Sequence, residues 1–139
     1  LLLATDGSDC SELAVRSVAE RLWPDGTQIR IISIADVAFP EAAWFFNQEG
    51  MEDLEEKFIT KAKEAIKTAQ QILREAGYHA SSAVLRGNAK ARIIEEAKEW
   101  DADLIVVGSQ GKRGLERALR GSVSESVVTH APCSVEVIR

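Results

Sequence analysis

The chain has 139 residues, of which 45% are hydrophobic and 28% are charged, and its formal net charge is -5. This length predicts a single domain over residues 1–139, with a hydrophobic core of ordinary size. The acidic balance disfavours nucleic-acid binding, which usually needs a basic face, and no apolar run approaches the roughly 18 residues of a membrane span.

The two cysteines, Cys10 and Cys133, lie far apart and lack the CxxC spacing of a redox or metal motif. Reduced thiols in a cytoplasmic protein are therefore expected. Because Leu1 opens directly in an apolar segment, we also expect further residues to precede it in the natural protein.

In the first half of the chain, apolar residues 1–5 predict a strand, and residues 6–9 predict a turn into a helix. Apolar residues recur at helical spacing in this helix: Leu13, Ala14, Val18 and Leu22. Residues 24–26 (Pro, Asp, Gly) end it, and the β-branched segment 29–34 predicts a second strand. Residues 36–50 have no clear period and predict a loop that carries the aromatic segment from Phe39 to Phe46.

In the second half, an apolar stripe from Leu54 to Ala76 predicts a long helix that stops at Gly77. The remaining expected elements are a strand over 79–85, a helix capped by Asn88 and ending near Trp100, a strand over 104–107, a helix from Ser122 to before Pro132, and a strand over 133–138. A short helical turn with Leu115, Ala118 and Leu119 is expected between the strand over 104–107 and the helix from Ser122.

Strands that alternate with helices predict the α/β class, with an open five-stranded parallel sheet and helices on both faces. In such sheets, ligands bind beyond the carboxyl ends of the strands, where the strand order reverses.

A glycine motif follows the strand predicted over residues 104–107. It has the spacing G-x2-G-x9-G-S, with Gly108, Gly111 and Gly121-Ser122 at its fixed positions. Glycine allows a backbone to approach a ligand closely, and free N–H groups at a helix start favour anions. Ser122 and Glu125 have the spacing of a capping box, which predicts that Ser122 caps the next helix. Together these features predict a phosphate-binding loop.

The same spacing is similar to the nucleotide-binding signature of the universal stress protein family. The opening segment Ala4–Ser8, the end of the second strand at Ile34–Asp36, and the segment Gly108–Pro132 resemble that family as well. The resemblance spans essentially the whole chain. It implies a Rossmann-like sheet with strand order 3-2-1-4-5, which the alternation of elements does not itself fix.

The resemblance also implies which residues bind a nucleotide. Asp6 and the backbone near Ala4 would contact the ribose or adenine side, and the Ile34 backbone would contact the adenine edge. The remaining residues would contact ribose and phosphates: Gly108, Gly111, Gly121, Ser122, Val123 and Ser124.

The function implied is that of an ATP-binding universal stress protein, with Mg2+ accompanying ATP, acting as a regulatory module in the stress response. A homodimer through the C-terminal strand is expected as well. A slow ATPase and a nucleotide-independent dimeric interaction module stay open as alternatives. The basic residues of the spacer are open to two interpretations, a phosphate clamp or a solvated helix face: Lys112, Arg113, Arg117 and Arg120.

Two other classes fit poorly. A response-regulator receiver would need paired acidic residues after the first strand and an aspartate after the third, which here ends Leu85-Arg86-Gly87. The ATP-pyrophosphatase group would show Ser-Gly-Gly-x-Asp after the first strand, where this chain has Asp6-Gly7-Ser8-Asp9.

Overall fold

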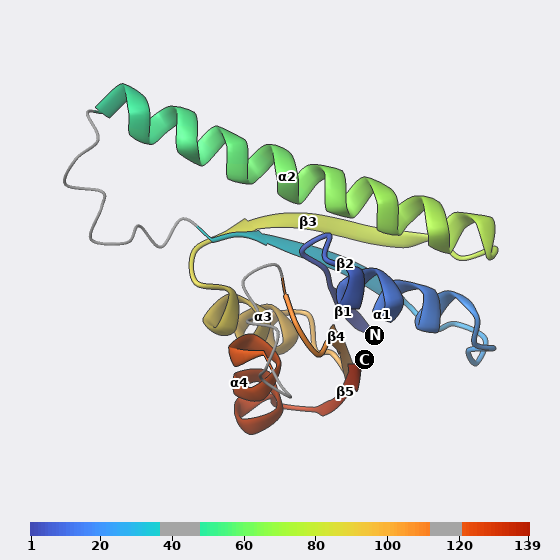
Figure 1. Ribbon diagram of the computed structural model, residues 1–139. Coiled ribbons are helices and arrows are strands. Elements are labelled where there is room, and N and C mark those ends of the chain that lie inside the picture. The colour runs from blue at the N-terminus through green and yellow to red at the C-terminus, as the bar shows by residue number, and fades with distance from the viewer. Residues whose placement is uncertain (37–47, 112–120) are drawn as a thin grey trace.

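Strands and helices alternate along the parts of the chain that this computed structural model describes, which are residues 1–36, 48–111 and 121–139 (Figure 1). In order they are β1 (Leu2–Ala4), α1 (Asp9–Ala19), β2 (Ile29–Ala35), α2 (Gln48–Glu75), β3 (Ala80–Arg86), α3 (Ala89–Glu99), β4 (Leu104–Gly108), α4 (Ser122–His130) and β5 (Ser134–Ile138). The predicted helical turn at Leu115 to Leu119 and the aromatic segment Phe39 to Phe46 lie outside the described residues.

The strands form one parallel sheet in the order β3-β2-β1-β4-β5. This confirms the predicted fold class and the strand order that the resemblance implied. β1 is the central strand, with β2 on one side of it and β4 on the other. The chain runs outward from β1 to β3 and then returns to β4, so the strand order reverses between β1 and β4.

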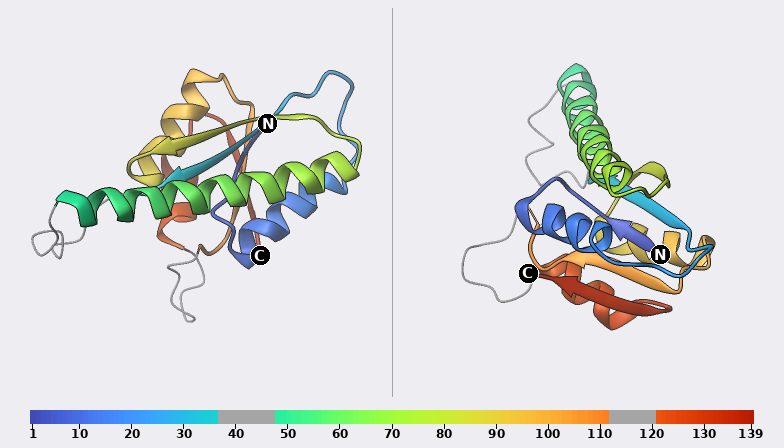
Figure 2. Two further views of the ribbon diagram at one scale, coloured as in Figure 1. Left: turned by 90° about the horizontal axis from the view of Figure 1, so that it is seen from above. Right: turned by 90° about the vertical axis from the view of Figure 1, so that its right-hand side faces the viewer.

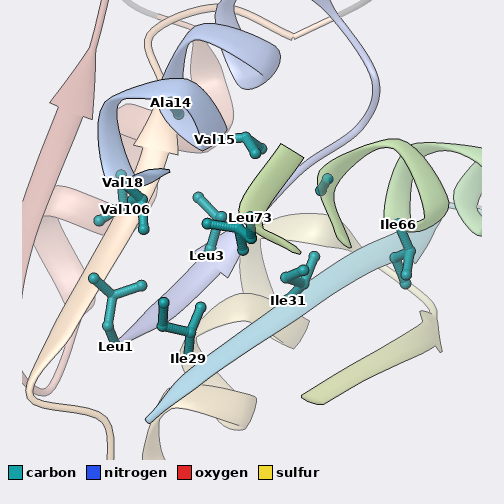
Figure 3. Close-up of a cluster of buried hydrophobic side chains, with 11 residues drawn as sticks. Leu1, Leu3, Ala14, Val15, Val18, Ile29, Ile31, Ile66, Leu73 and Val106 are labelled. Atoms are coloured by element: carbon teal, nitrogen blue, oxygen red, sulfur yellow. The ribbon is translucent and has the colours of Figure 1, made fainter. Parts of the chain in front are cut away.

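Helices cover both faces of the sheet (Figure 2). On one face, β-strand residues such as Leu3, Ile31 and Val106 pack against α1 and α2, as Figure 3 shows. On the other face, Leu2, Ile32 and their neighbours on β4 form a second core with α3 and α4. Successive strand residues point to opposite faces, so a fully buried sheet of this kind needs near-continuous apolar runs.

Local sequence accounts for several helix ends. The side chain of Ser8 caps α1, accepting a hydrogen bond from the Ser11 amide, and Asn88 caps α3 by accepting bonds from the Lys90 and Ala91 amides. After α2, Gly77 has a φ of 89°, the left-handed conformation in which glycine is favoured. The caps predicted at Asn88 and Gly77 are therefore confirmed.

Two expected helix boundaries are wrong. α1 ends at Ala19, and Leu22 lies beyond it with 98% of its surface exposed, so it is no part of an apolar stripe. Pro24 and Gly26 do not set this end; the helix stops several residues earlier. α2 begins at Gln48 rather than near Leu54, so residues 48–50 belong to the helix and not to the preceding loop.

The capping box predicted at Ser122 is also wrong. The N-cap of α4 is Gly121, which makes no side-chain cap, and Ser122 is an exposed residue of the first turn. Instead, the Ser124 hydroxyl donates to the carbonyls of Gly121 (2.9 Å) and Ser109 (3.0 Å). Serine and glutamate at this spacing thus mark the start of the helix to within one residue but do not identify its cap.

Candidate functional site

A pocket of about 400 Å³ lies at the carboxyl ends of β1, β2 and β4. This is the position, between β1 and β4, at which the strand order reverses. In open α/β sheets that crevice is where ligands bind, because the two strands diverge there and the loops that follow them turn to opposite faces.

The structure brings every residue of the predicted site to this pocket. Its lining includes Ala4, Asp6, Ile34, Gly108, Gly111, Gly121, Ser122, Val123 and Ser124. These residues come from four segments that are distant in sequence: the ends of β1, β2 and β4, and the first turn of α4. That they bind a nucleotide stays a prediction.

Ser109 connects the glycine loop to β5 and to the start of α4 through hydrogen bonds. Its amide donates to the carbonyl of Ile138 at the end of β5 (2.6 Å), and its carbonyl accepts from the Gly121 amide (2.6 Å). The same carbonyl also accepts the Ser124 hydroxyl, so Ser109 is buried between β5 and the start of α4. The amide groups at the start of α4 are thereby held in place beside the pocket.

Contacts within the protein favour glycine at the motif positions, most strongly at Gly108. A Cβ on Gly108 would lie 2.6 Å from the carbonyl carbon of Cys10 in α1, and one on Gly111 would lie 2.7 Å from Oδ2 of Asp6. A Cβ on Gly121 would lie 3.0 Å from the Ser109 carbonyl oxygen. The φ of Gly121 is -73°, a conformation open to any residue, so a positive φ is not what favours glycine at this position. Close packing of backbone against backbone, rather than backbone strain, selects glycine here.

Asp6 helps to form the turn between β1 and α1. One of its carboxylate oxygens accepts a hydrogen bond from the Ser8 amide at 3.0 Å, while Oδ2 faces the Cα of Gly111. The Ser8 hydroxyl donates to the Gln110 carbonyl at 3.3 Å, which joins this turn to the glycine loop. Asp6 therefore stabilises the turn after β1 and also lines the pocket, and these two roles are compatible.

The prediction missed one wall of the pocket. Phe58, Lys61 and Ala62 of α2 line it, together with Ser33 of β2. Phe58 and Ala62 are part of the apolar stripe that predicted the long helix, but periodicity gives no sign that one end of such a stripe faces a cavity. Figure 1 shows the cause: the N-terminal part of α2 reaches past the carboxyl ends of β2 and β3.

Other assignments can be placed as well. His130 is the last residue of α4, with Nδ1 3.0 Å from the Ser126 carbonyl oxygen. Trp23 and Trp100 pack against the two cores, and the thiols of Cys10 and Cys133 are free. The basic residues Lys112 to Arg120 lie outside the described residues. Within the described ranges, no helix is long and apolar enough to cross a membrane.

Comparison with known proteins agrees with this architecture. The family model described as "Universal stress protein family" matches residues 1–139. The chain is 38% identical to Universal stress protein Sll1388 of Synechocystis sp. over 149 residues, which cover 100% of this chain and 96% of the relative.

Solved structures give the same result. The structure titled "Structure-based assignment of the biochemical function of hypothetical protein MJ0577" superposes with a TM-score of 0.86 and 25% identity, covering 99% of this chain and 92% of the other. The universal stress protein from Archaeoglobus fulgidus in complex with dAMP superposes with a TM-score of 0.68 and 25% identity, covering 99% and 95%. The chain belongs to the universal stress protein family.

Proposed function

We propose that this protein binds ATP, accompanied by Mg2+, in the pocket between β1 and β4, and acts as a nucleotide-dependent regulatory module of the stress response. The observation that carries the proposal is the convergence of the glycine loop, the Asp6 turn and the first turn of α4 on one pocket. A relative of similar fold is described in complex with dAMP, an adenine nucleotide. The proposal extends that ligand class to this chain and to the triphosphate.

The phosphates would lie at the start of α4. Free amides and the helix dipole favour negative charge at a helix N-terminus, and Gly121 leaves the approach to those amides unobstructed by a side chain. The nucleoside would lie toward Ala4, Asp6 and Ile34, with the Ile34 backbone at the adenine edge. The pocket wall there is apolar on the α3 side, where Ile93 lines it.

The residues present fit Mg2+ only as a companion of the nucleotide. Among the described residues there is no group of three or more His, Cys, Asp or Glu side chains that could hold a metal ion by themselves. Asp6 and Asp36 both line the pocket, and carboxylates are suitable magnesium ligands when phosphate oxygens and water complete the octahedron. The ion would therefore offset phosphate charge rather than occupy a separate protein site.

Calorimetry with MgATP tests the proposal. We expect a dissociation constant in the micromolar range or tighter, where 1 μM corresponds to roughly -8 kcal/mol. Mass spectrometry of ligand released from the purified protein would identify the nucleotide that accompanies it. If millimolar ATP gives neither heat nor a thermal shift, the nucleotide-independent interaction module becomes the better proposal.

We also place the protein in the cytoplasm as a homodimer paired through β5. The support for the dimer is the position of β5 at one edge of the described sheet, where it has β4 as its neighbour on one side. A strand edge with unpaired amides and carbonyls is a surface on which a second strand can add.

A further inference from the structure

The lining of the pocket changes in character from one end to the other. At the end formed by the glycine loop and α4, backbone groups and small polar side chains dominate, as at Gly111, Gly121 and Ser122. At the end formed by β2, α2 and α3, apolar side chains gather: Ile34, Phe58, Ala62, Ala89 and Ile93. A ligand that fills the whole pocket therefore has a polar group at one end and an apolar group at the other.

The apolar end is bordered from both faces of the sheet. α2 packs on the face that carries Ile31, whereas Ile93 of α3 belongs to the core on the opposite face, together with Ile32. In Figure 1, α2 and α3 accordingly lie on opposite sides of β2. A flat group placed at the carboxyl end of β2 would have Phe58 of α2 on one side and Ile93 on the other.

Phe58 is held in position by its own helix. It lies four residues before Ala62, so the two share one face of α2, and both line the pocket. Farther along this face Ile66 is buried in the core, so the apolar stripe passes from the core into the pocket wall. One turn before Phe58, the carboxylate of Glu55 forms an ion pair with Arg86 at the end of β3 (2.8 Å), which joins this part of α2 to the sheet.

The core does not use the Phe58 ring. The side chain is half-buried, yet among the described residues it is not one of those that pack against either hydrophobic core. It is also the one aromatic side chain among the described residues that line the pocket. The neighbouring residues Ser33, Ala62 and Ala89 have small side chains, so the space beside the ring is open to a ligand.

A heteroaromatic base matches this end of the pocket. Aromatic side chains pack favourably against flat rings, and stacking on an aromatic side chain stabilises any base because every base has a π-face. Ser33 and Asp36 border the same end, so the surroundings are apolar toward the faces of a ring and polar toward its edge. An aliphatic ligand group would use the apolar contacts but not these polar ones.

We propose that Phe58 packs against one face of the adenine base, opposite Ile93, and thereby makes α2 the element that selects a purine over a pyrimidine. The inference rests on the proposed nucleotide binding and adds to it a residue outside the glycine motif. Phe58 responds to the size of the ring, whereas the distinction between adenine and guanine falls to the Ile34 backbone at the edge of the base. Phe58 is a specificity-determining residue with no part in bond breaking.

Calorimetric titrations of the full chain with MgATP, MgGTP and MgCTP test this assignment, because these ligands share ribose and triphosphate and differ only in the base. We expect Phe58→Ala to weaken ATP binding by roughly tenfold, within the range for loss of a base–aromatic contact. CTP binding should weaken by no more than about threefold, because the smaller ring covers less of the Phe58 side chain. The ratio of ATP to GTP affinity should stay within about twofold of the wild-type ratio, since both bases are purines.

Two control variants separate the ring from general effects on α2. Phe58→Tyr keeps an aromatic ring and should leave the affinity for each nucleotide within about twofold of the wild-type value. Ile59→Ala removes an apolar side chain from the same turn of α2 but not from the lining of the pocket, and should leave the ratio of ATP to CTP affinity unchanged. Because this ratio compares two ligands of one protein, a general loss of stability cancels in it.

Nuclear magnetic resonance gives a direct second measurement. In the complex with ATP, ring protons of Phe58, assigned by their loss in Phe58→Leu, should show nuclear Overhauser effects to H2 or H8 of adenine. Such effects arise only between protons in close proximity, so a purely structural role of Phe58 would not produce them.

Three results would overturn the assignment: equal losses of ATP and CTP affinity in Phe58→Ala, the same change of the ATP-to-CTP ratio in Ile59→Ala, or no Overhauser effect between Phe58 and adenine in a saturated complex. If the wild-type protein binds none of the three nucleotides, the proposed function itself fails. Normal wild-type binding of ATP together with an inert Phe58→Ala substitution rejects the role of Phe58 alone.

Discussion

At the scale of single residues, Ser109 explains why a small residue is favoured at position 121 of the glycine motif. Its backbone bonds to Ile138 and Gly121 at 2.6 Å, and its carbonyl also accepts the Ser124 hydroxyl. These bonds hold the glycine loop against the start of α4, where a side chain on Gly121 would meet main-chain atoms of Ser109 and Gln110. A side chain on Gly108 would instead meet the backbone of α1 at Cys10 and Ser11. Packing within the protein therefore favours these glycines, and the loop that they form lines the pocket.

Gly121→Val tests this close packing. Its Cβ would lie 3.0 Å from the Ser109 carbonyl oxygen and 3.3 Å from the Cα of Gln110, so the branched side chain must push the glycine loop away from α4. We expect a folded protein destabilised by about 1–3 kcal/mol, as for other overpacked sites, with ATP binding lost. Chemical denaturation and calorimetry measure the two effects, and normal ATP binding by a folded variant would mean that the cradle has been misplaced.

Asp6→Asn tests whether the site catalyses hydrolysis. Backbone amides, hydroxyls and the carboxylates that line the pocket bind ground state and transition state about equally, and uniform binding does not raise kcat. We expect turnover several orders of magnitude below the enzyme median of about 10 per second, with the substitution mainly weakening binding or its metal dependence. Rapid turnover in contaminant-free protein, abolished by Asp6→Asn at unchanged affinity, would instead indicate an enzyme.

At the scale of elements, an ion pair joins the segment just after α1 to the edge strand β5. The guanidinium of Arg21 donates to both carboxylate oxygens of Glu136, one at 2.6 Å, and also lies 5.8 Å from the ring centroid of Trp23. The hydrogen bond from Arg21 lowers the pKa of the Glu136 carboxyl from its ordinary value of 4.5. The pair is partly exposed, so its contribution to stability is modest.

The stability of the protein should therefore depend on pH through Glu136. A carboxyl whose pKa is lowered by folding adds stability above its unfolded pKa, and that stability is lost as the pH falls through the folded pKa. Below pH 4.5, the wild-type protein should approach the stability of Glu136→Gln, while at pH 7 it should be the more stable of the two. Urea unfolding at both pH values measures the difference. Glu12→Gln, which removes an exposed partner of Arg16, is the matched control with a smaller expected effect.

At the scale of the whole molecule, the described sheet has β3 and β5 at its two edges. α2 packs along β2 and β3 (Figure 1). Near the other edge, Leu22 is almost fully exposed and follows Arg21, the partner of Glu136 on β5. An exposed leucine beside an edge strand favours the β5 side as the contact between two copies.

A homodimer through β5 is the corresponding prediction. Light scattering at tens of micromolar, an order-of-magnitude working range, should give the mass of two chains. The charged variant Leu22→Glu should shift the equilibrium toward the monomer, whereas Leu13→Glu, which changes a half-exposed residue of α1, should leave it nearer the wild-type value. A wild-type monomer across this range would contradict the expected pairing.

The sequence by itself determined the order and type of the elements and the identity of the motif. Period and turn chemistry are local properties, so alternating strands and helices, the cap at Asn88 and the stop at Gly77 could be predicted directly. The predicted residues at the ends of β1, β2 and β4 and in the first turn of α4 line the pocket, and the resemblance supplied them because it spans the whole chain; Ser33 of β2 lines it as well and was not predicted.

Only the tertiary structure decided how those parts meet. The cap of α4 is Gly121 rather than Ser122, and the Gly121 amide and the Ser124 hydroxyl both bond to the Ser109 carbonyl, which are contacts that no local pattern contains. Leu22 remained exposed because its helix had already ended. Ser33 and Lys61 share a pocket because a parallel sheet places α2 beside the end of β2, and that proximity depends on packing between segments distant in the chain.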